Sequence, residues 1–146
     1  MAILVAVSTV TRAIEAEMAE THGLPITWFD VLNRLDQAPE QRLRIHELEE
    51  VSLFTRSGMT RLADRLETAG LVKRERDADD RRGVFLAITE LGKAKLGEVW
   101  PDHMRDIEEH FAGHINSSDA AALRSIAKKL IGHMPAIGKR AQRPQS

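Results

Sequence analysis

The sequence predicts a mainly α-helical protein with one small β-hairpin, and two patterns support this fold class. Over most of residues 1–38 and 89–134, apolar side chains recur every three or four positions, as on a helix with one buried face. Within residues 71–88, two short runs instead alternate like strands, on either side of the polar segment DADDRRG. A chain of 146 residues is long enough for one domain with a modest hydrophobic core.

Two helices and a short strand are predicted at the start of the chain. The first helix ends near His22 and Gly23 and carries one apolar stripe, formed by Ile3, Val7, Val10, Ile14 and Met18. Pro25 is suited to open the second helix, and the segment QAPEQ ends it. The side chains expected to face inward on this second helix are Trp28, Val31, Leu32 and Leu35. We expect residues 42–44 to form a very short strand.

Residues 45–70 have the pattern of two helices joined by a tight turn. The first helix is short, carries Ile45, Leu48 and Val51 on one side, and is followed by a turn over residues 52–54. Thr55 is suited to cap a longer second helix, which Gly70 ends. The buried face predicted for this second helix consists of Met59, Leu62, Ala63 and Leu66. The arrangement is a helix-turn-helix pattern, in which the second helix enters the major groove of DNA.

The outer face of this second helix carries the side chains that are expected to read DNA. At 100° per residue, the positions opposite the buried face are Ser57, Arg61, Asp64 and Thr68, with Thr60 and Arg65 flanking them. An arginine can bind the O6 and N7 atoms of guanine, and serine or threonine hydroxyls can bind bases or phosphates. The positive end of the helix dipole favours a phosphate at the helix N-terminus.

A hairpin follows the reader helix directly, which is the order of a wing. Val84, Leu86 and Ile88 are predicted to share one face of its second strand. Arg81 and Arg82 stand in its loop, where arginines suit the negative potential of a narrow minor groove. The acidic residues of the loop can orient this pair by ion pairing; they are Asp77, Asp79 and Asp80. An arginine pair in an isolated hairpin would more often be a solvated turn, but its place after a reader helix favours DNA contact.

Charge is distributed unevenly along the chain. The formal net charge is only −1, yet residues 55–85 hold eight of the 21 Lys and Arg side chains. With six acidic residues, this segment has a net charge of +2, whereas residues 1–54 carry four basic and nine acidic side chains, a net charge of −5. By charge alone, a solvated surface is as well supported as a DNA-binding one. The order of the motifs therefore decides in favour of DNA.

Residues 42–92 resemble the MarR (multiple antibiotic resistance regulator) family of winged helix-turn-helix repressors. The most specific feature is the motif DRRG, followed five residues after Gly83 by Ile88-Thr89, where the family usually has Leu-Thr. The resemblance implies a homodimer with interlocking terminal helices, two wings set for a palindromic double-stranded DNA site, and often a small ligand between the dimer helices and the DNA-binding lobe. The DNA-binding residues we predict are Thr55, Arg56, Ser57, Thr60, Arg61, Arg81 and Arg82. Asp80 matches the acidic residue that usually orients the wing arginine.

The helices outside the winged lobe favour a dimer independently of the family resemblance. Thr89 can cap a long helix, kinked by Pro101, whose stripe consists of Trp100, Met104, Ile107 and Phe111. A last helix starting within residues 116–119 is expected to turn inward Leu123, Ile126, Leu130 and Met134. Three terminal stripes exceed what one small lobe covers, so we favour a homodimer over an intramolecular core. We predict one domain over 1–146, with a winged lobe at about 40–92, dimerisation helices at 1–38 and 93–134, and a tail at 135–146.

Other classes of protein are less well supported. The chain has no cysteine and shows no phosphate-binding loop, nucleophile elbow or metalloprotease motif, so we predict no enzyme and no cofactor. His110 and His114 have a metal-compatible spacing but are more simply partly exposed histidines, and we predict no metal. The apolar N-terminus is too short for a membrane span, and we expect a cytoplasmic location. The alternative function is a helical ligand- or protein-binding module that never touches DNA.

A small-molecule effector is the switch that we expect. Candidate pocket residues, chosen by location on the second and fifth helices, are Trp28, Asn33, His103 and Met104. A small, partly aromatic anion bound between the dimer helices and the winged lobes would misplace both reader helices together. The competing hypothesis is a proton switch near pH 6, formed by His103, His110 and His114.

Overall fold

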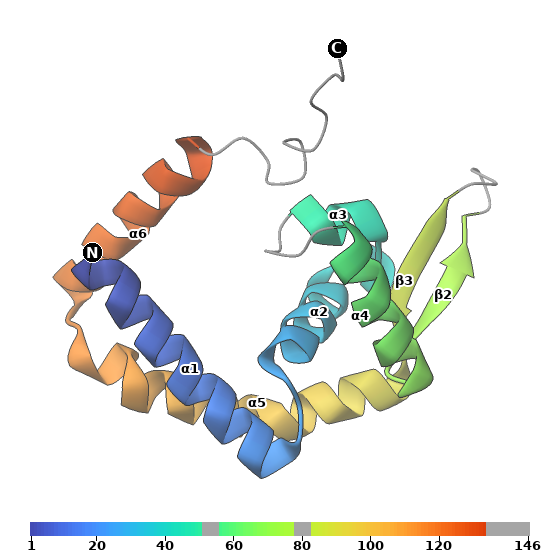
Figure 1. The fold of residues 1–146 in the computed structure, drawn as a ribbon, viewed down its shortest axis with the longest axis horizontal. Coiled ribbons are helices and arrows are strands. Elements are labelled where there is room, and N and C mark those ends of the chain that lie inside the picture. Colours follow the sequence, from blue (N-terminus) through green and yellow to red (C-terminus); the bar gives the residue numbers. More distant parts are fainter. Residues whose placement is uncertain (51–55, 78–82, 134–146) are drawn as a thin grey trace.

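The fold is mainly helical with one small sheet, as the sequence predicts (Figure 1). The computed structural model describes residues 1–50, 56–77 and 83–133. The α-helices in these residues are α1 (Ala2–His22), α2 (Ile26–Gln37), α3 (Ile45–Glu50), α4 (Arg56–Thr68), α5 (Glu90–His110) and α6 (Ser117–His133). The strands are β1 (Arg42–Arg44), β2 (Val72–Arg76) and β3 (Val84–Ile88), and short 3-10 turns cover Pro39–Gln41 and Ala112–His114.

The strands form one antiparallel sheet in the order β1-β3-β2. Leu43 of β1 pairs with Leu86, and Val72 of β2 pairs with Ile88, so the central strand β3 is held on both edges. The three residues predicted to share one face of β3 differ in burial. Leu86 and Ile88 are buried, but Val84 is 37% exposed because it lies at the loop end of the hairpin, beyond the edge of the core.

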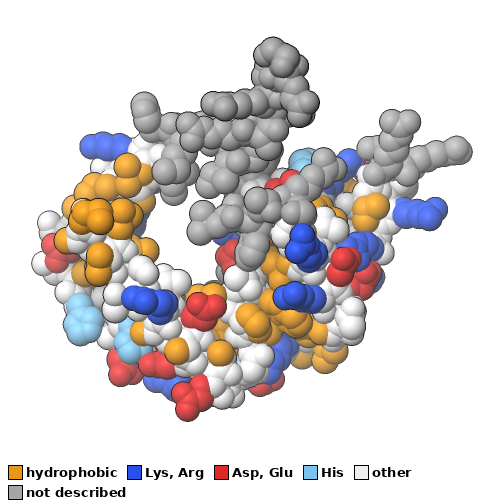
Figure 2. Space-filling model, viewed as in Figure 1, with side chains coloured by type: hydrophobic (Ala, Val, Ile, Leu, Met, Phe, Trp, Pro, Cys, Tyr) orange, Lys and Arg blue, Asp and Glu red, His pale blue; other side chains and the backbone are white. Residues whose placement is uncertain are grey.

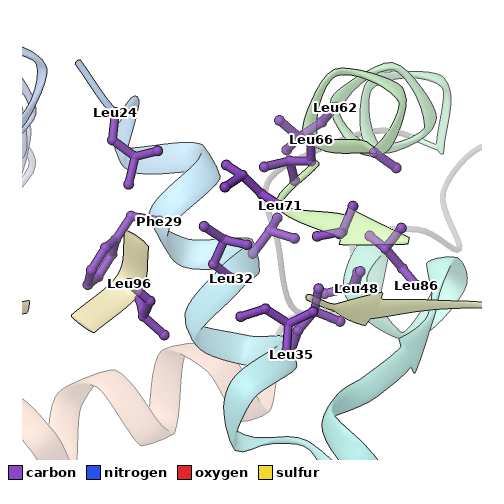
Figure 3. Close-up of a cluster of buried hydrophobic side chains, with 14 of the residues drawn as sticks. Leu24, Phe29, Leu32, Leu35, Leu48, Leu62, Leu66, Leu71, Leu86 and Leu96 are labelled. Atoms are coloured by element: carbon purple, nitrogen blue, oxygen red, sulfur yellow. The ribbon is translucent and has the colours of Figure 1, made fainter. Parts of the chain in front are cut away.

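One hydrophobic core joins α2, α3, α4 and the sheet (Figure 3). The predicted inward residues Val31, Leu32 and Leu35 of α2 are all buried, whereas Trp28 is only half-buried and packs against the core. Phe29, which the sequence pattern did not select, is buried. The underside of α4 is buried at all four predicted positions: Met59, Leu62, Ala63 and Leu66. We call this unit, residues 26–88, the winged lobe; Leu96 and Val99, in the first half of α5, pack against its core.

A tight joint connects the winged lobe to α5. The hydroxyl of Thr89 accepts a hydrogen bond from the backbone N–H of Gly92 (3.0 Å), which is the predicted N-cap. The same hydroxyl donates to the carbonyl of Gly70 at the end of α4 (2.7 Å), where Gly70 has a φ of +74°. A side chain at Gly92 would overlap the carbonyl oxygen of Leu71. These contacts fix the direction in which α5 leaves the lobe.

The second region is a helical arm, formed by α1, the second half of α5, and α6. Figure 1 shows α1 lying against α5, away from the sheet. Gly23 ends α1 in the left-handed conformation, as predicted, and Pro101 lies within α5, which continues to His110. Among the described residues, none of the helices is both long enough and apolar enough to cross a membrane.

The arm leaves most of its apolar stripes uncovered. On α1 only Ile14 and Met18 are buried, and no residue that the structure describes on α6 is buried. The prediction that Ile126 and Leu130 face inward does not hold within the single chain, where they are 45% and 59% exposed; Met134 lies outside the described residues. The stripe of α5 is exposed in the same way at Trp100, Met104 and Phe111.

Candidate nucleic-acid interface

Helix α4 presents a polar face to solvent because its apolar face is anchored in the core. Met59, Ala63 and Leu66 hold the underside with no exposed surface, and Thr60 and Arg61 are exposed on the upper face. Of the predicted DNA-contacting residues, these two alone have side chains within the described part of the chain. Arg56 and Ser57 begin α4, but their side chains are not described; Thr55, Asp80, Arg81 and Arg82 lie outside the described residues.

The other end of α4 is tied to the hairpin by an arginine of β2. The Arg74 guanidinium lies 2.6 Å from Oδ1 of Asp64 and also pairs with Glu67, whose carboxylate accepts the backbone N–H of Arg74 (3.1 Å). Burial lowers the pKa of Arg74, but the hydrogen bonds with these two carboxylates outweigh burial and raise the pKa overall. Asp64 therefore binds an arginine of the hairpin, and this ion pair and the one with Glu67 hold the reader helix and the hairpin together.

The base of the hairpin loop is closed by Asp77 and Gly83, which flank the loop, and by Arg44 at the end of β1. The backbone N–H of Asp77 donates to the carbonyl of Gly83 (3.0 Å), which extends the β2-β3 pairing by one position. The carboxylate of Asp77 pairs with Arg44 of β1. A contact between β1 and the loop was not predicted, because the two residues are 33 positions apart and no local pattern relates them.

A hollow of about 220 Å³ separates the base of the wing from the reader helix. Its lining residues are Arg44, Ile45, His46, Glu49, Thr60, Gly83 and Val84. Thr60 of α4 and Gly83 of the hairpin thus border one concave surface. Figure 2 shows blue Lys and Arg side chains beside red acidic ones on this side of the molecule. Arg44, which lines the hollow, is itself paired with the carboxylate of Asp77.

A second cavity, of about 480 Å³, lies between α2 and α5. It is lined by Asn33, Asp36, Gln37, Lys93, Leu96, Gly97 and Trp100. Of the four predicted pocket residues, Asn33 alone lines this cavity. Trp28 packs against the core, and Met104 is 45% exposed. The fifth helix supplies Lys93, Gly97 and Trp100. Their spacing of four and three positions in the sequence indicates that they lie on one helix face.

The three histidines of the proposed proton switch lie in different surroundings. The His103 ring packs on Phe29, with ring centroids 4.3 Å apart, and burial lowers the pKa of His103. Nε2 of His110 lies 2.6 Å from Oε1 of Glu17 on α1, and this hydrogen bond raises the pKa of His110. His114 contacts the carbonyl of Glu109 through Nε2 (2.8 Å). The described residues contain no group of three or more His, Asp or Glu side chains arranged to hold a metal ion.

Comparison with known proteins gives a consistent result. The model of the MarR family matches residues 22–83. The HTH-type transcriptional regulator MhqR of Bacillus subtilis (strain 168) is 32% identical over 110 residues, which cover 73% of this chain and 74% of that protein. The transcriptional repressor MprA of Escherichia coli (strain K12) is 27% identical over 118 residues, covering 81% of this chain and 66% of that protein.

A solved structure agrees over nearly the whole fold. Sco3205, a MarR family transcriptional regulator from Streptomyces coelicolor crystallised in complex with DNA, superposes with a TM-score of 0.87. The match covers 94% of this chain and 87% of that one. The sequence identity is 24%, so this likeness concerns the fold alone.

Proposed function

This chain belongs to the MarR family and is a DNA-binding transcriptional regulator, and we propose that it acts as a homodimeric repressor of a palindromic operator which a small ligand causes it to release. The observation that carries the proposal is the orientation of α4. Its underside is fixed in the core, and its upper face presents Thr60 and Arg61 beside the base of the wing. This is the geometry that a helix needs to enter a major groove about 12 Å wide.

Each reader helix would contribute base and phosphate contacts. Arg61 is suited to bind the O6 and N7 atoms of a guanine, and Thr60 to bind a base edge or a phosphate. Ser57 and Arg56, in the first turn of the same helix, complete the proposed contact set together with Thr55. On the hairpin, Arg82 with Arg81 beside it is proposed to enter the adjacent minor groove, oriented by Asp80.

A homodimer would cover the uncovered stripes of the arm. The exposed large apolar side chains on α1 and α6 are Ile3, Leu4, Val5, Val7, Ile126 and Leu130. Burial of apolar surface stabilises by about 25 cal/mol per Å², so a second copy packed on these helices would gain from each of them. A two-fold dimer presents two reader helices about 34 Å apart, which matches palindromic half-sites one helical turn apart.

The cavity between α2 and α5 is the effector site that we propose. A volume of about 480 Å³ lies within the range of about 300–1,000 Å³ that small-molecule sites occupy. Trp100 offers an aromatic surface and Lys93 a positive charge, which suit a small, partly aromatic anion. Because α2 belongs to the winged lobe and α5 continues into the arm, a ligand there could favour one angle between them. The ligand can shift the equilibrium between two such angles only by the difference between its binding free energies to them, about 1–3 kcal/mol.

Substitution of Arg61 tests the proposed reader. We expect Arg61→Ala to lose about 1–3 kcal/mol of binding to the best site and to relax preference at one base position. The measurement is selection from a random duplex library followed by titration of single-base variants. Arg12→Ala is the matched control, because it removes the same charge from an exposed position on α1. Equal weakening on all sequences would make Arg61 a phosphate contact instead.

The salt dependence of binding tests the wing and the alternative function. Arg82→Ala should lower the slope of log affinity against log salt by about one phosphate equivalent, with a milder effect of Arg81→Ala. A helical module that binds only ligands or proteins would show no salt-sensitive binding to duplex DNA. If neither arginine changes affinity or footprint, the wing has no contact with DNA.

A further inference from the structure

Two arginines of β1 lie on the same aromatic ring in the sheet. The guanidinium carbons of Arg42 and Arg44 stand 4.6 and 5.1 Å from the ring centroid of Phe85 in β3. Their side chains are 31% and 30% exposed, so the two cations have similar stacking and similar access to solvent. Such stacking on a ring face favours a fixed guanidinium orientation. The two arginines are therefore matched in stacking and exposure, and they pair with different acidic residues.

The acidic partners lie in different parts of the hairpin. Arg42 pairs with Glu75 (3.4 Å), which is inside strand β2, and with Glu40 just before β1. Arg44 pairs with Asp77, the first residue after β2, whose side chain is only 10% exposed. Arg42 thus joins two regular strands, whereas Arg44 joins β1 to the position where the wing loop begins.

The end of the wing loop meets the same arginine. Gly83 follows the loop, and its carbonyl accepts the backbone N–H of Asp77. A Cβ at Gly83 would lie 2.9 Å from Cβ of Asp77 and 3.1 Å from Nη1 of Arg44, closer than packed atoms normally approach. Gly83 therefore lies in close contact with Asp77 and Arg44, and both ends of the loop are held against β1.

We propose that Arg44 is a positioning residue for the wing: its ion pair with Asp77 sets the direction in which the loop that carries Arg81 and Arg82 leaves the sheet. The inference rests on the proposed function, because it assigns Arg44 a part in DNA binding through that loop. Only five residues separate Asp77 from Gly83 in the sequence, and Arg81 and Arg82 are two of them, so we expect the placement of Asp77 and Gly83 to matter for these arginines. Loss of the ion pair would leave the sheet intact and reduce the contribution of the wing.

Arg44 acts through the loop rather than as a phosphate contact of its own. Its guanidinium is engaged by Asp77 on one side and by the Phe85 ring on another. A DNA phosphate would have to compete with a carboxylate that is already largely shielded from solvent, and shielding strengthens the existing pair. The two roles differ in a measurable way, because a direct contact would be energetically independent of Arg82.

The experiment is a double-mutant cycle on a duplex selected from a random library by the wild-type protein. Arg44→Gln should weaken binding about tenfold, the size of one lost charge-assisted contact, and lower the salt slope as Arg82→Ala does. The double variant should bind no more weakly than the weaker single variant. Asp77→Asn removes the same ion pair from the other side and should reproduce the effect. Arg42→Gln, the matched control, should change affinity by less than twofold.

The outcomes separate this inference from the proposed function. If the wild type shows no salt-sensitive binding to duplex DNA, the proposed function fails and this inference fails with it. If the wild type selects a sequence but the losses from Arg44→Gln and Arg82→Ala add, Arg44 contacts DNA directly and positioning is wrong. An equal loss from Arg42→Gln would indicate a general effect on the sheet. Thermal unfolding identifies a misfolded Arg44 variant, in which case Asp77→Asn decides.

Discussion

The winged lobe and the helical arm bury their apolar side chains to very different degrees. In the lobe, Leu35, Leu66 and Leu86 have no exposed surface, although they come from three elements far apart in the sequence. In the arm, Leu4 and Leu130 are 67% and 59% exposed. The exposed leucines of the arm are therefore not the result of a lack of apolar residues in the chain. The lobe forms a complete hydrophobic core by itself, and we infer that the arm completes its core only with the arm of a second copy.

The two regions also use different charges. The lobe is braced by Arg42, Arg44 and Arg74, whose charges persist at any pH at which the protein is folded. The arm joins α1 to α5 through histidines: His22 lies 2.9 Å from Asp102, and His110 pairs with Glu17. The hydrogen bond with Glu17 raises the pKa of His110, so we expect a pH dependence of the arm that comes from this pair.

The largest effect should come from a charge placed on the arm. Leu130→Asp would put a carboxylate into the proposed dimer interface, and we expect the mass in light scattering to fall from twice 16.3 kDa to 16.3 kDa at micromolar concentration. Affinity for the operator should fall about a hundredfold or more, because one reader helix would no longer hold the other near its half-site.

Leu91→Asp is the matched control for this substitution. Leu91 is 58% exposed, against 59% for Leu130, but it lies at the start of α5 beside the lobe. It should leave the mass and the affinity close to those of the wild type. A dimer that persists in Leu130→Asp would mean that α6 is not part of the interface.

The next largest effect should come from a cavity in the lobe. Leu66→Ala removes a side chain with no exposed surface, and we expect it to lower the free energy of unfolding by about 2–5 kcal/mol in urea titrations. Leu91→Ala, the same substitution at an exposed position, should change it by less than about 0.5 kcal/mol. Similar losses in both variants would contradict the view that stability resides in the lobe core.

Two glycines of α5 test the joint between the regions. Alanine at Gly92 would overlap the carbonyl oxygen of Leu71, so we expect Gly92→Ala to cost about 1–3 kcal/mol. Gly97, five residues further along the same helix, has no atom within 4 Å of a new Cβ, and Gly97→Ala should stabilise by about 0.5–1 kcal/mol. Melting temperatures measured side by side would show opposite signs; shifts of the same sign would mean that the joint is not tightly packed.

The smallest effect is the pH dependence of the arm. The hydrogen bond with Glu17 raises the pKa of His110 above its ordinary value, so its contribution to stability is fully present below about pH 6.5. That contribution is lost as the pH rises through the higher pKa of the folded protein. The melting temperature of the wild type should therefore drop more between pH 6 and pH 8.5 than that of His110→Gln. Parallel curves for the two proteins would show that this pair carries no pH dependence.

Local patterns in the sequence were sufficient for the helices, the strands and the polar face of the reader. The cap at Thr89, the left-handed glycine at Gly23 and the buried underside of α4 depend on neighbours within a few positions, so their signals are visible in the sequence. The candidate pocket is less visible in the sequence. The predicted pocket residues include Asn33, but the sequence pattern places Trp100 in the dimer stripe, because the residues of one helix face do not specify which element packs against that face.

The sequence by itself determined the fold class, the order of the helices and strands, and the family resemblance, since helix periodicity, capping and turn residues act over short distances. Only the tertiary structure decided which apolar stripes are covered and which charges meet. Ile126 and Leu130 have the spacing of a buried face but are 45% and 59% exposed in the single chain. Arg44 and Asp77 meet because strand pairing brings together residues 33 positions apart. Burial and ion pairing depend on residues far away in the sequence, and a local pattern does not specify which distant residue a side chain contacts.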